Sequence, residues 1–373
     1  MAKRILITGG AGFIGSHLAD NLLQHGYEVR ALDCLSSQVH GEHARRPDYL
    51  DPDVELQVGD VRDPVAVRRA LEGVDAVYHF AAKVGVGQSM YQVADYTAVN
   101  NEGTAVLLEA LIERPVERLI VASSMSIYGE GLYRTPAGEL ISGAERGLAQ
   151  LQMHDWELRT SRGDTLTPVP TPETKSPALA SVYALGKYDQ ERMCLLVGRA
   201  YKIPTVALRF FNVYGPRQAL SNPYTGVLAI FAARYLADQP PVIFEDGLQQ
   251  RDFVNVRDIA EGCRLALEVT RAADKVFNLG SGEHFTVRAV AERISAALGK
   301  EHIEPRIAQQ YRVGDIRHCF ADITLARRVL GYSPQVAFDE GLGELAEWLQ
   351  GRTESAQPAA DAGTELAARG LTV

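Results

Sequence analysis

Two patterns of apolar and polar residues alternate over the first third of the chain. Short apolar runs predict strands over residues 3–8, 28–33, 54–58, 76–80 and 118–122. Apolar residues spaced three or four apart predict helices over residues 13–25, 64–71 and 93–113. Asp63 and Pro64 suit the N-cap and the first position of the second helix. Because strands and helices alternate, we expect a parallel sheet with crossover helices.

The rest of the chain contains an interruption and then a second region. Residues 131–177 are rich in glycine and proline, so we expect a surface insertion with one short helix near residues 145–152. A helix over residues 182–201 and a strand over residues 205–210 then resume the first pattern. Beyond residue 214 the pattern is less regular, with a short strand at 242–244 and helices at 259–268 and 287–298. This change predicts a second, smaller α/β lobe.

Composition and charge exclude several classes of protein. The 373 residues carry 38 Lys and Arg against 47 Asp and Glu, and the net charge of −9 disfavours nucleic acid and anionic membranes as partners. No apolar run reaches the roughly 18 residues of a membrane span, and the N-terminus lacks the features of a signal peptide. The cysteines (Cys34, Cys194, Cys263, Cys319) form no C-x-x-C pair. We therefore expect a cytoplasmic protein with reduced thiols and no metal site.

A glycine-rich turn follows the first predicted strand. Its sequence, Gly9-Gly10-Ala11-Gly12-Phe13-Ile14-Gly15, contains G-x-x-G-x-x-G between a strand and a helix. Glycines there allow the backbone to approach a pyrophosphate, which then faces the N–H groups of the helix. Asp33 ends the second strand 18 positions after Gly15, where a carboxylate accepts hydrogen bonds from the ribose of NAD and repels the 2′-phosphate of NADP. A plain tight turn and a solvated Asp33 are the alternatives.

Three residues further along the chain are the catalytic candidates. Tyr183 and Lys187 form Y-x-x-x-K, and in a helix this spacing puts both side chains on one face. An ammonium near a phenol lowers the pKa of the phenol, so that the tyrosine can exchange a proton with a sugar hydroxyl. Ser124 follows a buried strand and can hydrogen-bond the reacting oxygen. A surface pair and a serine-rich turn without chemistry remain the alternatives.

A series of motifs runs through the chain in a specific order. They are G-x-x-G-x-x-G at 9–15, Gly59-Asp60-Val61, His79-Phe80-Ala81-Ala82, Val99-Asn100, Ser123-Ser124 through Tyr128-Gly129, Tyr183 to Lys187, Arg209 to Arg217, and Arg251-Asp252-Phe253-Val254. Over residues 3–350 this order resembles the extended short-chain dehydrogenase/reductase family, in its nucleotide-sugar epimerase/dehydratase branch. The resemblance implies an α/β fold with a doubly wound Rossmann-type parallel sheet and a second, smaller α/β substrate lobe.

The resemblance also implies domains and binding residues. Residues 1–214 would form the NAD-binding Rossmann domain, joined by residues 250–272; residues 215–350 would form the nucleotide-sugar lobe, and residues 351–373 a disordered tail. The expected NAD-binding residues are Gly9, Gly12, Phe13, Ile14, Gly15, Asp33, Asp60, Val61, Phe80, Ala81, Ala82, Asn100, Tyr183 and Lys187. The expected substrate-binding residues are Val86, Gly87, Ser124, Ser126, Asn212, Arg251 and Arg312. For Arg251 and Arg312, ordinary surface ion pairs are the alternative.

The chain departs from the family pattern in two places. Gly186 stands where the family often has serine, and 59 positions separate Ser124 from Tyr183, an excess that matches the insertion.

Dehydratases of this branch carry T-D-E where this chain has Ser124-Met125-Ser126. Methionine cannot transfer a proton and serine is a poor acid, so dehydration is disfavoured, and decarboxylation likewise.

Reversible oxidation at C4 of the sugar remains. We expect an NAD-dependent 4-epimerase that forms a transient 4-keto sugar on a UDP- or dTDP-sugar. The pattern of residues 84–91 resembles that of epimerases acting on a dTDP-6-deoxyhexose such as dTDP-L-rhamnose. A 4-ketoreductase or dehydrogenase with exchangeable NAD(P)H and a redox-inactive NAD-sensing protein are the alternatives. Members of the family usually dimerise through two helices of each subunit. The resemblance therefore predicts a homodimer that forms through residues 93–113 and 182–201.

Overall fold

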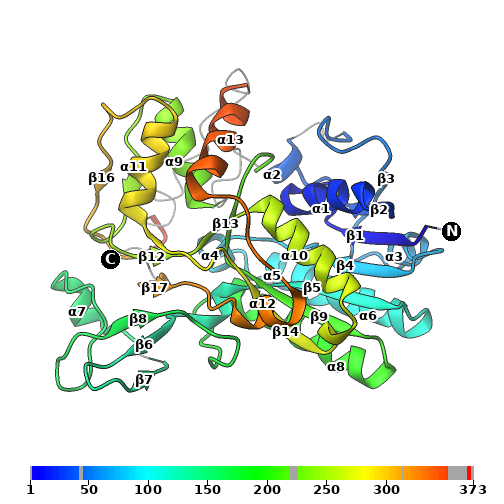
Figure 1. Cartoon of the computed structure of the whole chain (residues 1–373), viewed down its shortest axis with the longest axis horizontal. Helices are drawn as coiled ribbons and strands as arrows, with labels where there is room; N and C mark the ends of the chain where they lie inside the picture. The colour runs from blue at the N-terminus through cyan, green and yellow to red at the C-terminus, as the bar shows by residue number, and fades with distance from the viewer. Residues whose placement is uncertain are drawn as a thin grey trace.

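A seven-stranded parallel sheet is the centre of the larger domain (Figure 1). The computed structural model describes residues 2–41, 45–143, 145–218, 226–312, 314–351 and 368–370. The sheet has the order β14-β9-β5-β4-β1-β2-β3. Its strands are β1 (Arg4–Thr8), β2 (Glu28–Asp33), β3 (Glu55–Val58), β4 (Ala76–His79), β5 (Arg118–Ser124), β9 (Thr205–Phe210) and β14 (Lys275–Leu279). The strand order reverses between β1 and β4, the switch point at which α/β proteins form their sites.

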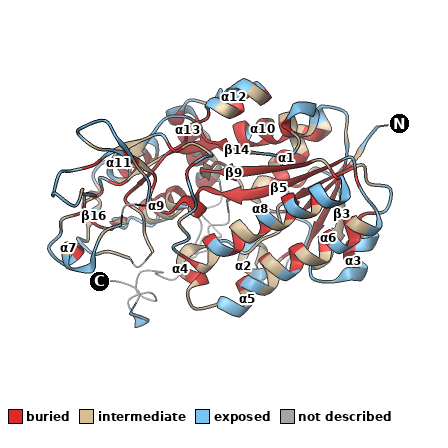
Figure 2. Ribbon diagram, turned by 90° about the horizontal axis from the view of Figure 1, so that it is seen from below, coloured by how far each residue is buried: buried red, intermediate tan, exposed pale blue. Residues whose placement is uncertain are grey.

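Helices cover both faces of this sheet (Figure 2). One face packs on α1 (Phe13–Gln24), α10 (Val256–Glu268) and α12 (Thr324–Leu330), and the other on α3 (Pro64–Ala70), α6 (Gly103–Glu113) and α8 (Val182–Tyr201). Successive strand residues supply different cores, since Ile5 and Ile7 join the first and Leu6 the second. The doubly wound α/β fold predicted from the alternating pattern is confirmed.

The helix predicted over residues 93–113 contains a π-helical turn that its periodicity did not reveal. It consists of α5 (Val93–Thr97), the turn Ala98–Glu102 and then α6. A π-helical turn inserts one residue into a helix and is common near functional sites. Gly186 of α8 packs against this turn, because a Cβ at Gly186 would lie 3.2 Å from Asn101 Oδ1. Glycine in place of the family's serine therefore allows close packing of two helices.

The second lobe has a core of its own, as predicted. Its helices are α9 (Val227–Leu236), α11 (Val287–Ala297) and α13 (Phe338–Gln350), and their apolar faces pack together. The short strands are β10 (Asn212–Tyr214), β11 (Val242–Ile243), β12 (Gln250–Arg251), β13 (Phe253–Asn255), β15 (Phe285–Thr286), β16 (Arg306–Ile307) and β17 (His318–Cys319). Residues 250–272 were expected to return to the main sheet. β14, which follows that segment in the sequence, also belongs to this sheet. The expected disordered tail lies almost wholly outside the described residues.

The insertion at residues 131–177 is more ordered than its glycines and prolines suggest. The short helix is present as α7 (Leu148–Gln152). A small antiparallel sheet, which we did not predict, joins β6 (Leu132–Arg134), β7 (Leu140–Ile141) and β8 (Thr167–Val169). Tyr133, Leu158 and Leu166 form its buried core. Both views place the insertion and the second lobe at the same end of the molecule (Figures 1 and 2).

The remaining elements are short. They are α2 (Ser37–His40), α4 (Val86–Ser89) and the 3₁₀ turns Met125–Tyr128 and Thr270–Ala272. Among the described residues, no helix has the length and apolar character that crossing a bilayer requires. The same ranges hold no cluster of three or more His, Cys, Asp or Glu side chains fit for a metal ion. Cys34, Cys194, Cys263 and Cys319 are free thiols.

Candidate active site

The glycine turn between β1 and α1 is closely packed. A Cβ at Gly15 would lie 2.4 Å from Gly9 O, and one at Gly9 would lie 3.0 Å from Ala81 N. Gly9 also has a φ of +73°, which favours glycine. Gly12 caps α1 without a side-chain hydrogen bond, so the N–H groups of Phe13, Ile14 and Gly15 face outward from the first turn of the helix. The turn therefore directs backbone N–H donors and the N-terminus of α1 toward the same side of the turn.

Asp33 holds the glycine turn from the end of β2. Its Oδ2 accepts from Ala11 N at 3.0 Å, and its Oδ1 accepts from Leu35 N at 2.9 Å. The side chain is almost fully buried. Each carboxylate oxygen has room for a second hydrogen bond. Asp33 is thus a structural residue whose free lone pairs are still able to meet a ribose.

The other expected NAD-binding residues gather around the same edge of the sheet. Asp60 pairs with Arg62 at 2.6 Å, and Val61 is buried beside Gly103. Phe80, Ala81 and Ala82 follow β4, and Thr8 accepts from the N–H groups of Phe80 and Ala81 at 3.2 Å each. The amide of Asn100 is bonded to both backbone groups of Lys83. Asn100 therefore fixes the backbone of the loop that follows β4.

Ser124, Ser126 and Tyr183 meet at the end of β5. The Ser126 hydroxyl donates to Ser124 Oγ at 2.9 Å, and Ser126 N donates to the same atom at 3.1 Å. Burial raises the pKa of Tyr183, whereas a hydrogen bond with Ser124 acts in the opposite direction. Tyr183 N also donates to Ser89 Oγ at 3.0 Å, so the start of α8 is fixed to α4. The serine-rich strand end and the tyrosine thus form one cluster.

Lys187 lies one turn after Tyr183 and is 3% exposed. Its Nζ donates to Gln190 Oε1 at 2.8 Å. Burial lowers the pKa of Lys187 to about 8, while the nearby Cys194 and Glu191 act to raise it. Among the described residues, no hydrogen bond joins Lys187 directly to Tyr183. Lys187 is thus buried and Tyr183 is partly buried, which disfavours the alternative of a surface pair.

The segment with Val86 and Gly87 lies beside Tyr183. Both residues belong to α4, whose Ser89 donates to Val86 O at 2.6 Å and accepts from Tyr183 N. The Tyr96 hydroxyl donates to Val84 O at 2.8 Å, and Tyr183 is among the groups that raise the pKa of Tyr96. These contacts bring residues 84–89 to the tyrosine, where we expected them to line the sugar pocket.

The expected diphosphate ligands have unequal surroundings. Asn212 Oδ1 is buried and has no hydrogen-bond partner among the residues that the structure describes. Arg251 Nη1 donates to Arg317 O at 2.8 Å, and its Nη2 donates to Ile316 O, and Arg251 forms no ion pair within the described part of the chain. Arg312 does pair with Asp315 at 2.8 Å, and its guanidinium lies 4.7 Å from the centre of the Phe244 ring. The ion-pair alternative therefore describes Arg312 and fails for Arg251.

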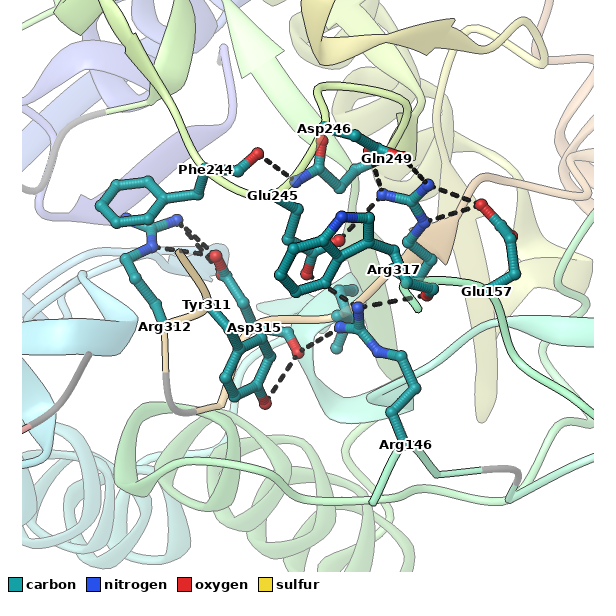
Figure 3. Close-up of polar contacts among 12 residues, drawn as sticks. Arg146, Glu157, Phe244, Glu245, Asp246, Gln249, Tyr311, Arg312, Asp315 and Arg317 are labelled. Carbon is teal, nitrogen blue, oxygen red and sulfur yellow. Dashed lines mark hydrogen bonds and ion pairs between the residues drawn. The ribbon is translucent and has the colours of Figure 1, made fainter. Parts of the chain in front are cut away.

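Charged side chains next to this segment join the insertion to the second lobe (Figure 3). Arg146 of the insertion pairs with Glu245 at 2.8 Å, and its guanidinium lies 5.3 Å from the centre of the Tyr311 ring. Arg317 pairs with Glu245, Asp246 and Glu157, and its side chain is fully buried. The segment that carries Arg312 is thus held from the insertion side.

The comparison with protein families shows to which family the chain belongs. The family described as "NAD dependent epimerase/dehydratase family" matches residues 5–145 and 163–280. The chain belongs to this family. The region between the two matched parts lies within the insertion, the part of the chain that we expected to depart from the family.

Named relatives agree along nearly the whole epimerase. It is 35% identical over 358 residues to a dTDP-L-rhamnose 4-epimerase of Burkholderia thailandensis, covering 93% of this chain and 95% of the relative. It is similar to the structure of a Thermotoga maritima UDP-glucose 4-epimerase with UDP-glucose, with TM-score 0.76, 30% identity and coverage of 94% and 99%. A Thermus thermophilus UDP-glucose 4-epimerase in complex with NAD gives TM-score 0.72 and 30% identity, with coverage of 94% and 99%. The chain is an NAD-dependent nucleotide-sugar epimerase.

The glycine turn of the epimerase fits NAD. A pyrophosphate needs backbone donors at close range, and the turn supplies them because its glycines leave no side chain in the way. Asp33 retains acceptor positions for a ribose, and its charge disfavours a 2′-phosphate. The fit rests on this chain's own geometry.

Sequence reasoning missed Gln190 and its neighbours. The amide of Gln190 lies between Lys187, Thr104 and Ala81, and the side chain is fully buried. A glutamine among the polar residues of α8 has no motif to mark it. Its position three residues after Lys187, on nearly the same face of the helix, was the available signal.

Proposed function

We propose that this enzyme epimerises C4 of a dTDP-6-deoxyhexose such as dTDP-L-rhamnose. The observation that carries the proposal is the cluster of Ser124, Ser126 and Tyr183, in which serine hydroxyls and a phenol form hydrogen bonds with no acidic partner among the described residues. Met125 is buried beside them, where a dehydratase would need an acid. The named relative of Burkholderia thailandensis supports the choice of sugar.

In this proposal Tyr183 is the acid–base residue. As a phenolate it takes the proton of the C4 hydroxyl, and it returns a proton to that oxygen when the 4-keto sugar is reduced on its other face. The glycine turn and Asp33 would hold NAD, which would supply the acceptor, and then the donor, of the C4 hydride. Ser124 hydrogen-bonds Tyr183 and aligns the reacting oxygen, and Lys187 supplies positive charge one turn away. One proton and one hydride thus leave the sugar at C4, and one of each returns to it.

The substrate-binding residues extend the same proposal. Val86 and Gly87 line the sugar pocket because α4 is bonded to the start of α8. Asn212 offers a buried amide oxygen that has no partner in the described ranges. Arg251 and Arg312 bring positive charge to the diphosphate, and the guanidinium of Arg251 is held by the carbonyl groups of residues 316 and 317. We expect the contact with the base, which is thymine in this proposal, to come from the region around residues 242–245.

A homodimer is part of the proposal. Val93 of α5 and Leu185 and Leu196 of α8 are 47%, 46% and 55% exposed, which leaves apolar surface on the two helices predicted to pair between subunits. We expect sedimentation to give twice the mass of one chain. A species with the mass of a single chain at all concentrations would contradict the dimer.

A panel of nucleotide sugars tests the function. The purified enzyme is incubated without oxygen and without added cofactor, with UDP- and dTDP-hexoses that include dTDP-L-rhamnose, and the C4 configuration is read by proton NMR. We expect a C4 epimer of a dTDP-6-deoxyhexose without net NADH. Epimerisation of UDP-hexoses alone would overturn the substrate, and consumption of NAD(P)H with a 4-keto sugar would instead establish a ketoreductase.

A further inference from the structure

The Gln190 side chain has a fixed orientation in the interior of α8. Its Nε2 donates to Thr104 Oγ1 at 2.9 Å and lies 3.4 Å from the acceptor Ala81 O. Because both neighbours accept at the NH₂ end, the carbonyl end is turned toward Lys187, whose Nζ donates to it at 2.8 Å. An amide held on both sides has one preferred position.

The support continues into the sheet through His79. His79 Nε2 lies 2.8 Å from Thr104 Oγ1, and its Nδ1 lies 2.9 Å from Thr8 Oγ1. Burial, with the nearby charge of Lys187, lowers the pKa of His79 to about 3, so this residue stays neutral in the working range of an enzyme. The hydroxyl of Thr104 donates to Asn100 O at 2.6 Å. Gln190 thus connects the lysine to the ends of β1 and β4.

Four other titratable groups lie near Lys187, and in the described part of the chain none of them accepts a hydrogen bond from its ammonium group. Glu191 on α8 is paired with Arg209 at 2.7 Å and accepts from Ser123 at 2.6 Å. Burial raises the pKa of the Cys194 thiol to about 12, so it carries no charge. Tyr183 lies one turn before Lys187, and His79 faces the lysine from β4. Among the described residues, Gln190 Oε1 is the hydrogen-bond acceptor of the Lys187 ammonium group.

We propose that Gln190 is the positioning residue that holds Lys187 in place and keeps its ammonium group charged during turnover. The proposal deepens the proposed function and rests on it, since it takes Lys187 as the cation that serves Tyr183. A neutral acceptor stabilises a buried ammonium ion without removing its charge from the site, and two N–H groups of the lysine remain for other partners.

Two substitutions of Gln190 have opposite expected effects. Gln190→Met keeps the length of the side chain and removes the acceptor, so the alkaline limb of the pH profile of kcat shifts down by about one pH unit. Gln190→Glu keeps the acceptor and adds a negative charge, so the same limb shifts up. KM stays within about twofold in both, because Gln190 touches no substrate. Gln24→Met, at an exposed position at the end of α1, is the control and leaves the profile unchanged.

A second measurement does not depend on turnover. The tyrosinate absorbance of Tyr183 is obtained as the difference between the holoenzyme and its Tyr183→Phe variant, each with and without Gln190→Met. We expect Tyr183 to titrate at higher pH in Gln190→Met, because the lysine loses its charge earlier. Superimposable titrations and pH profiles would overturn the proposal, as would a uniform loss of kcat with a lower Tm and no shift. If the wild-type enzyme proves inactive on every sugar, the proposed function fails while this titration still decides the role of Gln190.

Discussion

The guanidinium group of Arg317 lies 2.8 Å from the carboxylate of Glu245, and the two side chains are 0% and 2% exposed. They come from the segments that precede β17 and follow β11. Arg146 of the insertion pairs with the same carboxylate at 2.8 Å (Figure 3). Removal of one partner from a buried ion pair leaves an uncompensated charge, which is costly. The insertion is therefore tied energetically to the lobe that carries Arg312.

We expect Arg146→Met to destabilise the fold by about 3 kcal/mol, because it leaves Glu245 with one cation fewer in the interior. Arg159→Met is the matched control on the same insertion, since Arg159 pairs with Asp155 at the surface. There the expected cost is below about 1 kcal/mol. Urea unfolding of both variants gives the comparison. Equal costs in the two variants would show that the buried network contributes nothing beyond a surface pair.

The glycine turn gives a second prediction. A Cβ at Gly15 would lie 2.4 Å from Gly9 O, and one at Gly12 would lie 3.3 Å from the same atom. We therefore expect Gly15→Ala to displace the turn and to lower the affinity for NAD at least tenfold, with Gly12→Ala milder. NAD content after purification and titration calorimetry with NAD measure the effect. Retention of NAD by Gly15→Ala at the wild-type level would contradict the account of the turn.

The catalytic cluster gives a third prediction. Tyr183→Phe removes the proton carrier and should lower kcat by at least about a hundredfold, whereas Ser124→Ala removes one hydrogen bond to Tyr183 and should lower it by about tenfold or more. Both variants should keep their bound NAD, which absorbance shows. Full activity of Tyr183→Phe would contradict the role of Tyr183 as the acid–base residue.

Asp252 gives a prediction on stability and pH. Its carboxylate is fully buried and accepts from Ser281 N at 2.7 Å and from Gly282 N at 3.0 Å. Burial raises the pKa of Asp252 from 3.8 to about 6, and the hydrogen bonds offset part of this effect. The folded state therefore holds its proton to higher pH than the unfolded state does. The contribution of this group is fully present below about pH 4 and is lost as the pH rises to about 6, by about 3 kcal/mol.

The Asp252→Asn variant isolates this contribution, because asparagine does not titrate. We expect the stability of the wild-type protein, relative to the variant, to fall as the pH rises from about 4 to about 6. Urea unfolding of both proteins at several pH values supplies the difference. A difference independent of pH would mean that the buried carboxyl titrates as it does in the unfolded chain.

Local patterns predicted much of the fold and the cofactor turn. Strands such as β2 and β9 and the helix α8 were placed at their observed bounds, because the strands are short apolar runs and the helix has apolar residues at helical spacing. The strands β6, β7 and β8 were missed because two or three residues carry no readable period. β6 pairs with β7 a few residues further along the chain, and with β8 only after most of the insertion has passed.

Contacts between distant residues set the limit of prediction in the site. The motif Y-x-x-x-K gave Tyr183 and Lys187 but not the partner of the lysine, since Gln190 is oriented by Thr104 and Ala81 from other elements. The contacts of Arg251 with the carbonyl groups of residues 316 and 317 likewise arise because β12 pairs with β17. Such relationships depend on tertiary packing and have no local signature.

The most direct test of the central claim follows a deuterium label at C4. The purified holoenzyme is incubated with dTDP-L-rhamnose deuterated at C4, in ordinary water and without added cofactor, and the product is read by proton NMR and mass spectrometry. The account predicts the C4 epimer with its deuterium retained, because the hydride returns to the carbon it left. An epimer that has lost the label to solvent, or a reaction that proceeds only with added NAD(P)H, would contradict it.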